Sequence, residues 1–216
     1  MNFEKLDFRP DGVIFDVDGT IWDSTPIVTE AWNRALVDTG HPQVSVTADR
    51  LKGLFGLPML EIMRDVLPGV SEKEVRAFDK VCIEYEQNAL IESSGIPYLN
   101  IEETIKKLSE SCKVIIVSNC QSGYIELMMK HLGIEAYVTD KICHGDNGLS
   151  KAENIKLMNE RHSLKRSVYV GDTIMDANAC KEAEEFFIFA SYGFGHVEEP
   201  DAVIDEPEQL LEMFEN

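Results

Sequence analysis

The sequence lacks the cysteine pattern of a disulfide-stabilised or zinc-stabilised protein. Its five cysteines are an odd number, and no two of them form a Cys-x-x-Cys pair. Disulfide frameworks use even numbers of cysteines, and structural zinc sites use closely spaced pairs. The pattern therefore argues against both and favours a reducing compartment. The cysteines are Cys82, Cys112, Cys120, Cys143 and Cys180.

Long apolar runs are missing as well. No segment approaches the roughly 18 consecutive apolar residues of a membrane-spanning helix. Residues 1–10 include acidic residues and have no apolar core of the kind that secretory signals carry. We therefore expect a cytoplasmic protein with no membrane partner.

Positive charge is scarce. Twenty Lys and Arg stand against 39 Asp and Glu, which gives a formal net charge of −19. This field repels nucleic acid and anionic membrane surfaces, so neither is an expected partner. It would also oppose an anionic small substrate, so a phosphate site would need a local metal ion, a lysine and backbone amides. The 216 residues, 44% of them hydrophobic, suffice for one globular domain with or without an insertion.

The most informative segment is residues 13–20, VIFDVDGT. Val13, Ile14 and Phe15 predict a buried strand, and alternation along a strand places Asp16 and Asp18 on the same side where it ends. Two carboxylates so close together favour a bound cation, and oxygen ligands favour a hard one such as magnesium. A strand that ends in an ordinary Asp-Gly turn would give the same pattern, so the rest of the chain must distinguish the two.

Residues 22–93 predict four consecutive helices without a strand between them. Thr25-Pro26 is typical of a helix start, and Ser71 with Glu74 matches a capping box. Because the strand before this segment needs a sheet to pair with, the helical segment must be an insertion.

After about residue 95, strand-like and helix-like segments alternate. This alternation predicts a parallel sheet covered by helices on both faces. We therefore expect an α/β fold, with a doubly wound, Rossmann-like core of residues 1–21 and 94–216 and an inserted all-helical domain of residues 22–93. The expected strands are 113–117, 136–139, 168–170 and 186–190; helices are expected at 100–108 (capped by Asn100), 122–131, from 150 onward and at 176–184, and residues 206–216 are expected to form a solvated tail.

Polar residues follow the strands at the edge where open parallel sheets bind ligands. Ser118 and Asn119 end the second strand just before a helix start, where free backbone N–H groups favour an anion. Lys151 lies at the start of a helix, where the helix dipole disfavours a cation unless an anion lies opposite. Asp172 follows the strand 168–170, and Asp176 begins the next helix.

Taken together, these motifs resemble the haloacid dehalogenase-like superfamily of hydrolases. The first motif of that family matches Asp16-x-Asp18-Gly19-Thr20, and the second, third and fourth match Ser118, Lys151 and Gly171-Asp172 with Asp176, in the family's order. The helical insertion looks like the family's helical cap. Asp23-Ser24-x-Pro26 and Gly56-Leu57-Pro58 resemble the branch of phosphoglycolate phosphatase and beta-phosphoglucomutase.

The resemblance implies a magnesium-dependent phosphatase that acts on a small phosphorylated metabolite. Asp16 would form an aspartyl-phosphate, and Asp18 would protonate the leaving alcohol and then activate water. Implied phosphate-binding residues are Ser118, Asn119 and Lys151; implied magnesium ligands are Asp16, Asp18 through its backbone carbonyl and Asp172, with Asp176 orienting Lys151 or a metal-bound water.

Two alternatives remain open. A phosphomutase keeps both aspartates but returns the phosphoryl group to the substrate, and a non-catalytic regulator would only bind phosphate. A dehalogenase is disfavoured because it has no leaving alkoxide for Asp18 to protonate. The sequence defines neither the substrate nor the oligomeric state. Candidates for substrate contacts in the insertion are Lys52, Arg64 and the loop 53–58, whereas Trp32 and Phe55 are expected in its apolar core.

Overall fold

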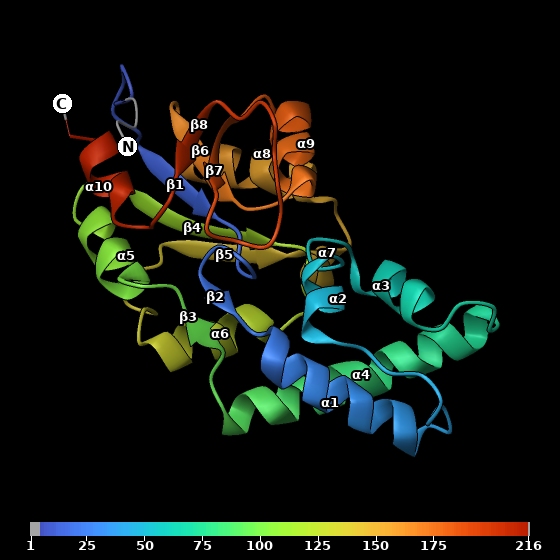
Figure 1. Ribbon diagram of the computed structural model, residues 1–216. Coiled ribbons are helices and arrows are strands. Elements are labelled where there is room, and N and C mark those ends of the chain that lie inside the picture. The colour runs from blue at the N-terminus through green and yellow to red at the C-terminus, as the bar shows by residue number, and fades with distance from the viewer. Residues whose placement is uncertain (1–4, 216) are drawn as a thin grey trace.

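The computed structural model describes residues 5–215 and has a six-stranded parallel sheet at its centre (Figure 1). Outside this range lie residues 1–4 and residue 216. The expectation about a secretory signal in residues 1–10 falls partly on these residues. The strand order is β5-β4-β1-β6-β7-β8. These strands are β1 (Gly12–Phe15), β4 (Lys113–Ser118), β5 (Asp140–Cys143), β6 (Ser167–Gly171), β7 (Phe186–Ala190) and β8 (Ala202–Ile204).

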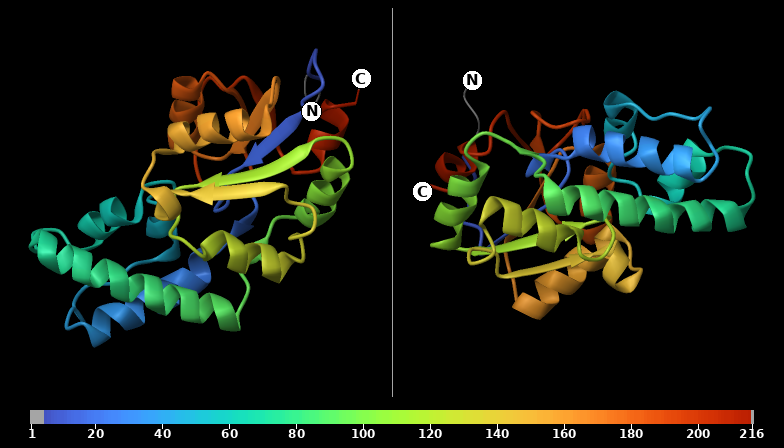
Figure 2. Two further views of the ribbon diagram at one scale, coloured as in Figure 1. Left: turned by 180° about the vertical axis from the view of Figure 1, so that it is seen from behind. Right: turned by 90° about the horizontal axis from the view of Figure 1, so that it is seen from below.

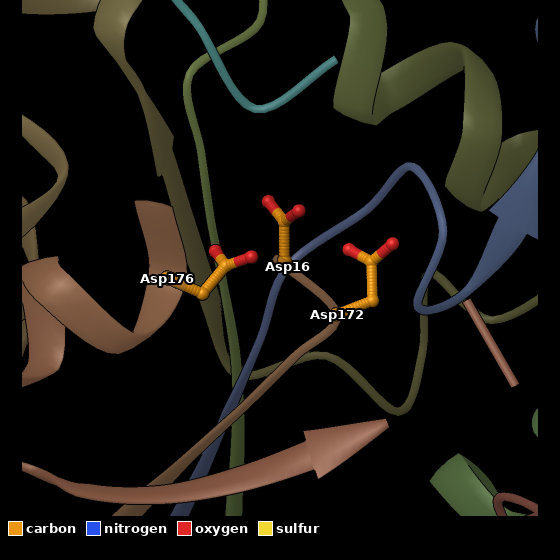
Figure 3. Close-up of side chains that lie close together, drawn as sticks. All are labelled: Asp16, Asp172 and Asp176. Carbon is orange, nitrogen blue, oxygen red and sulfur yellow. The ribbon is translucent and has the colours of Figure 1, made fainter. Parts of the chain in front are cut away.

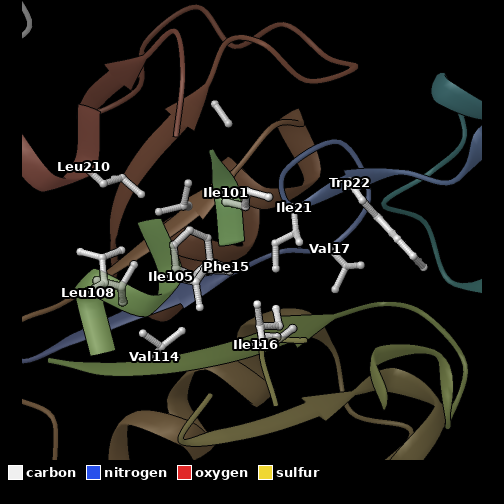
Figure 4. Packing of buried hydrophobic residues seen from close by; sticks show 14 of the residues in the cluster. Phe15, Val17, Ile21, Trp22, Ile101, Ile105, Leu108, Val114, Ile116 and Leu210 are labelled. Carbon is white, nitrogen blue, oxygen red and sulfur yellow. The ribbon is translucent and has the colours of Figure 1, made fainter. Parts of the chain in front are cut away.

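Strand β1 lies between β4 and β6, and its side chains alternate between two apolar layers. Val13 and Phe15 pack into one cluster, whereas Ile14 packs into the other. Figure 4 shows Phe15 among residues of the first cluster. All four residues of β1 are buried, which explains why the strand reads as a continuous apolar run: both faces of the sheet are covered.

Helices cover both faces of the sheet (Figure 2). The first cluster takes side chains from α5 (Ile101–Ser109), α6 (Tyr124–Leu132) and α10 (Gln209–Met213), and the second from α8 (Lys151–His162) and α9 (Ile174–Ala183). A short helix, α7 (His144–Asn147), follows β5. The expected α/β fold with a doubly wound parallel sheet is confirmed.

The segment between β1 and the rest of the sheet is helical. It contains α1 (Thr25–Asp38), α2 (Ala48–Lys52), α3 (Met59–Val66) and α4 (Glu72–Glu92), and it packs around its own apolar cluster. The capping box at Ser71 and Glu74 is present. Figures 1 and 2 place this helical layer beside the carboxyl ends of the sheet strands.

A two-stranded antiparallel ribbon connects the two parts. Strands β2 (Trp22–Asp23) and β3 (Ile96–Pro97) pair where the chain leaves the sheet region and where it returns. Trp22 is fully buried, and a Cβ atom on Gly95 would lie 2.7 Å from its indole ring. Only glycine therefore lets the returning backbone approach the indole this closely.

Three expectations about secondary structure were wrong. The strand expected at residues 136–139 instead comprises residues 140–143, which form β5. This edge strand takes its register from β4, in which Ile115 pairs with Asp140. The expected solvated tail contains α10, in which Leu210 and Met213 are buried. Asn100 precedes α5 with a φ of 61° and makes no capping hydrogen bond. Within residues 5–215, no helix is long and apolar enough to cross a membrane.

Candidate active site

Asp16 and Asp18 follow β1 and line the same cavity, which opens between the carboxyl ends of the strands and the helical layer. Asp16 is the first residue after the strand and is only 3% exposed. Burial disfavours the charged carboxylate and raises the pKa of Asp16 to about 6, although Lys151 opposes this shift. The expectation from strand alternation thus agrees with the positions of both carboxylates.

Two hydroxyl groups hold the carboxyl group of Asp18. The Ser24 hydroxyl donates to Asp18 Oδ1 at 2.6 Å, and the Tyr124 hydroxyl donates to the same oxygen at 2.7 Å. Burial raises the pKa of Asp18 to about 7, against the opposing effect of these hydrogen bonds. A carboxyl group with this pKa can hold a proton near neutral pH and can also release it, as acid/base catalysis requires.

Lys151 is the first residue of α8 and lies between two carboxylates. Its Nζ lies 3.0 Å from Asp16 Oδ1 and 2.5 Å from Asp176 Oδ1. The side chain is only 3% exposed, and these partners hold the pKa of the ammonium above its ordinary value despite its burial. The unfavourable position at a helix start is therefore offset by the anions opposite it.

Asp172 follows β6 and is fully buried. Its Oδ2 accepts a 2.7 Å hydrogen bond from the backbone N–H of Phe194, whereas its buried Oδ1 has no hydrogen-bond partner among the described residues. Gly19 and Gly193 press against this carboxylate: a Cβ atom would lie 2.0 Å from Asp172 Oδ2 at Gly19 and 2.2 Å from Asp172 Cβ at Gly193. Burial raises the pKa of Asp172 well above its usual range.

Asp176 uses both of its carboxylate oxygens within the protein. Oδ1 accepts from Lys151 and from the Tyr169 hydroxyl, and Oδ2 accepts from the backbone N–H and hydroxyl of Thr173. Although burial disfavours ionisation, Lys151 and Thr173 outweigh it and lower the pKa of Asp176. This carboxylate is thus ionised and already fully hydrogen-bonded.

The donor atoms fit a hard divalent cation. Asp16, Asp172 and Asp176 offer oxygens that lie within 4.8 Å of one another, and Figure 3 shows the three carboxylates side by side. If all three carboxylates ionised, the single ammonium of Lys151 would leave two negative charges uncompensated, and a divalent cation would balance them. The unpaired buried Oδ1 of Asp172 needs a partner, and oxygen-only ligands suit magnesium. Because Asp176 has no free oxygen, Asp16 and Asp172 are the better side-chain ligands.

Ser118 and Asn119 lie beside this cluster at the end of β4. Ser118 is 5% exposed, and both residues line the cavity. Asn119 Nδ2 donates to the backbone carbonyl of Gly56 in the helical layer at 2.7 Å, which leaves its buried Oδ1 without a partner. Asn119 therefore joins the strand end to the 53–58 loop.

Only some of the substrate contacts expected from the helical layer lie at the cavity. From the 53–58 loop, Phe55, Gly56 and Leu57 line the cavity, whereas Lys52 and Arg64 do not. Lys52 pairs with Asp23 at 3.1 Å, and the exposed Arg64 pairs with Glu72 at 2.9 Å. Trp32 and Phe55 are buried in the apolar cluster as expected, and both also line the cavity.

Several site residues escaped the sequence analysis. Tyr124 and Glu86 fall within expected helices and carried no signal of their own, yet both line the cavity, and Glu86 is only 3% exposed. The amide of Phe194 belongs to a loop without a motif. For these residues, the motif with Ser24 and Pro26, close to Asp18 in the sequence, was the one local signal. Contacts between distant segments leave no pattern in a single sequence.

The chain matches the family model of haloacid dehalogenase-like hydrolases over residues 13–190. It is 29% identical to the phosphoglycolate phosphatase of Vibrio parahaemolyticus serotype O3:K6, over 93% of this chain and 94% of that protein. It is 28% identical to the phosphoglycolate phosphatase of Vibrio cholerae serotype O1, over 93% of this chain and 95% of that protein.

Solved structures share the fold at lower identity. A haloacid dehalogenase-like family hydrolase from Streptococcus pneumoniae superposes with a TM-score of 0.82 at 22% identity, covering 95% of this chain and 98% of that one. A protein described as a predicted phosphoglycolate phosphatase from Haemophilus somnus 129PT gives a TM-score of 0.83 at 18% identity, covering 97% and 100%.

Proposed function

Because the chain belongs to the haloacid dehalogenase-like hydrolase family, we propose that it is a magnesium-dependent phosphatase that cleaves a small phosphate monoester through an aspartyl-phosphate on Asp16. The observation that carries the proposal is the arrangement around Asp16. One oxygen of this carboxylate lies 3.0 Å from the Lys151 ammonium, and Asp18 lines the same cavity. A nucleophile, a cation and an acid/base group thus surround one small space.

In the first step, the Asp16 carboxylate attacks the phosphorus atom, and the bond to the leaving alkoxide breaks. Asp18 gives its proton to that alkoxide. The Ser24 and Tyr124 hydroxyls orient the Asp18 carboxyl group during this transfer. In the second step, the ionised Asp18 takes a proton from water, and the resulting hydroxide attacks the aspartyl-phosphate and releases phosphate.

The remaining polar residues bind the phosphate. Lys151 and Ser118, with the second N–H of the Asn119 side-chain amide, would contact its non-bridging oxygens, where negative charge is spread in the transition state. Asp176 holds the Lys151 ammonium at 2.5 Å and so fixes its position rather than touching the substrate.

Magnesium would be held by Asp16, by Asp172 and by the backbone carbonyl of Asp18, and when bound it would neutralise part of the negative charge on the phosphate. We assign this metal from the oxygen-only donors and from the unpaired Oδ1 of Asp172.

Residues 22–93 would act as a cap that closes over the phosphate and excludes water. The bond from Asn119 to Gly56, together with the cavity lining shared by both parts, supports this role. Residues 1–21 and 94–216 would form the catalytic core.

The test is phosphate release from p-nitrophenyl phosphate with magnesium and with a chelator. Acid-quenched mass spectrometry would then look for a phosphoryl group on the peptide that contains Asp16. We expect magnesium-dependent release and a modified Asp16. Phosphate release that persists unchanged in the chelator would contradict the proposed dependence on magnesium. Phosphate binding without any release would indicate a non-catalytic regulator.

A further inference from the structure

The cavity between the core and the helical layer is poor in positive charge. Among its lining residues in the described part of the chain, there is no lysine, arginine or histidine. The helical layer contributes five apolar or aromatic side chains to the lining: Trp32, Phe55, Leu57, Met59 and Ile62. A leaving group attached to a phosphate at Asp16 would extend toward these side chains.

One carboxylate interrupts this apolar surface. Glu86 lies on α4, is 3% exposed and lines the cavity. Its Oε2 accepts a 2.8 Å hydrogen bond from the indole N–H of Trp32, and its Oε1 accepts one of 2.8 Å from the side-chain amide of Gln121. Both donors are neutral, so no cation balances this carboxylate when it is ionised.

A second acceptor lies in the same cavity. Asn119 Oδ1 is buried without a hydrogen-bond partner, because the other end of this amide is held by Gly56. A buried acceptor without a donor is costly, and a ligand that supplies the donor removes that cost. The cavity therefore holds a carboxylate without a balancing cation and an amide oxygen without a donor.

Lys151 and Lys52 are already engaged in ion pairs. Lys151 lies between Asp16 and Asp176, and Lys52 pairs with Asp23 outside the cavity lining. With a net charge of −19, the chain as a whole adds no positive field to compensate for a second anionic group on the substrate.

Building on the proposed phosphatase function, we propose that this cavity selects a leaving group that donates hydrogen bonds and carries no negative charge, and that Glu86 is the residue that excludes a carboxylate. A carboxylate on the substrate would lie close to the like charge of Glu86 in a water-poor space, whereas a hydroxyl or ammonium group would find acceptors there. The proposed substrate thus differs in charge from phosphoglycolate, after which the relatives are named.

Four two-carbon phosphate monoesters of nearly equal size test the proposal. They are 2-hydroxyethyl phosphate, 2-aminoethyl phosphate, ethyl phosphate and 2-phosphoglycolate, which end in a neutral donor, a cationic donor, a methyl group and a carboxylate. Phosphate release is measured about one pH unit above the pKa of Glu86, which burial raises to about 7, so that the carboxylate is ionised. p-Nitrophenyl phosphate serves as the common reference.

For the wild-type protein, we expect kcat/KM to be at least about tenfold higher for the better of the two donor substrates than for 2-phosphoglycolate, with ethyl phosphate between them. The comparison of the hydroxyl and ammonium substrates then shows which donor the site prefers. A kcat/KM for 2-phosphoglycolate that equals or exceeds those of both donor substrates would overturn the proposal, as would a lack of measurable release from both donor substrates.

Two variants locate the cause of the selection. Glu86→Gln keeps the shape and removes the charge, so it should lower the ratio of donor substrate to 2-phosphoglycolate by about tenfold. The exposed Glu84 lies on the same helix outside the cavity lining, and Glu84→Gln should leave the ratio unchanged. If a folded Glu86→Gln variant keeps the same ratio of kcat/KM values, Glu86 is not the residue that excludes a carboxylate.

Met59→Lys keeps the experiment decisive if Glu86→Gln does not fold. This substitution brings an ammonium into the cavity lining and should raise kcat/KM for 2-phosphoglycolate relative to 2-hydroxyethyl phosphate by roughly tenfold. If this ratio of kcat/KM values does not rise, the lack of positive charge in the cavity is not the reason why 2-phosphoglycolate is a poor substrate. If p-nitrophenyl phosphate is not cleaved either, the phosphatase function itself fails, and this inference fails with it.

Discussion

The two sides of the cavity are built on different principles. On the core side, Lys151 pairs with Asp16 and Asp176, and Asp172 lies within the same cluster of carboxylates. On the side of the helical layer, apolar side chains surround the single carboxylate of Glu86. Under the proposed function, the core side would transfer the phosphoryl group of any ester, whereas the helical side would discriminate among leaving groups. Reaction and selection would then be carried by separate segments of the chain.

The largest effect is expected from Asp16→Asn. This substitution removes the nucleophile, so kcat for p-nitrophenyl phosphate should fall by roughly 10³-fold or more. Thermal melting checks that the variant is folded. Asp49→Asn, at an exposed position on α2, serves as the control and should retain activity. Substantial activity in folded Asp16→Asn would mean that the core side does not supply the nucleophile.

A second experiment separates two neighbouring carboxylates of the core side. Asp172→Asn weakens a proposed magnesium ligand, so the magnesium concentration for half-maximal activity should rise by roughly 100-fold or more, whereas Asp176→Asn, which acts through Lys151, should raise it by about tenfold. A magnesium titration of both variants measures this difference. The opposite order would make Asp176 the metal ligand despite its four hydrogen bonds.

A third prediction concerns stability on the helical side. Burial raises the pKa of Glu86 from 4.5 to about 7. Between these values the unfolded chain releases the proton and the folded chain keeps it, so stability falls as pH rises. The wild type should lose roughly 3 kcal/mol of unfolding free energy across this window, since each pKa unit is worth about 1.4 kcal/mol.

Glu86→Gln has no such group, so its unfolding free energy relative to the wild type should rise by this amount between the same pH values. Urea unfolding at several pH values measures the difference, and Glu84→Gln should show no such trend. A constant difference between Glu86→Gln and wild type would mean that Glu86 ionises with an ordinary pKa in the folded protein.

The smallest effect is expected at the boundary between the two sides. Tyr124→Phe removes one of the two hydroxyl donors to Asp18 and leaves Ser24 in place. We expect kcat to fall by about tenfold, because the acid/base group is held less firmly. Since the lost hydrogen bond lowers the pKa of Asp18, the pKa seen in the pH profile should move upward. Tyr85→Phe, whose exposed hydroxyl bonds Asp38, is the matched control, and an equal fall in both variants would contradict the assignment.

The positions of the core-side residues were predictable from the sequence, because these residues follow strands that can be recognised as apolar runs. Asp16 follows β1 and Asp172 follows β6, and parallel strands bring such ends together. The position of β5 was not predictable, because the apolar residues before it resemble a strand and only pairing with β4 sets the register. Which residues serve as metal ligands and phosphate contacts stays a prediction until it is tested.

The helical side was less predictable because its contacts join distant segments. Glu86 and Gln121 lie on α4 and before α6, and nothing in either segment indicates the other. A helix position occupied by glutamate usually faces solvent, so the burial of Glu86 had no local signal. Docking of one part of the chain on another decides such positions.

The β2–β3 ribbon has a consequence for how this molecule can change. Asp23 pairs with Ile96 and Trp22 with Pro97, so the four helices begin and end at adjacent points. The cost of closing a chain segment rises only slowly with its length. A shorter or longer segment could be grafted between the same two strands while β1 and β4 keep their pairing. If Ser24 is kept beside Asp18, the ribbon is thus a point at which a new substrate range could be engineered onto the same reaction centre.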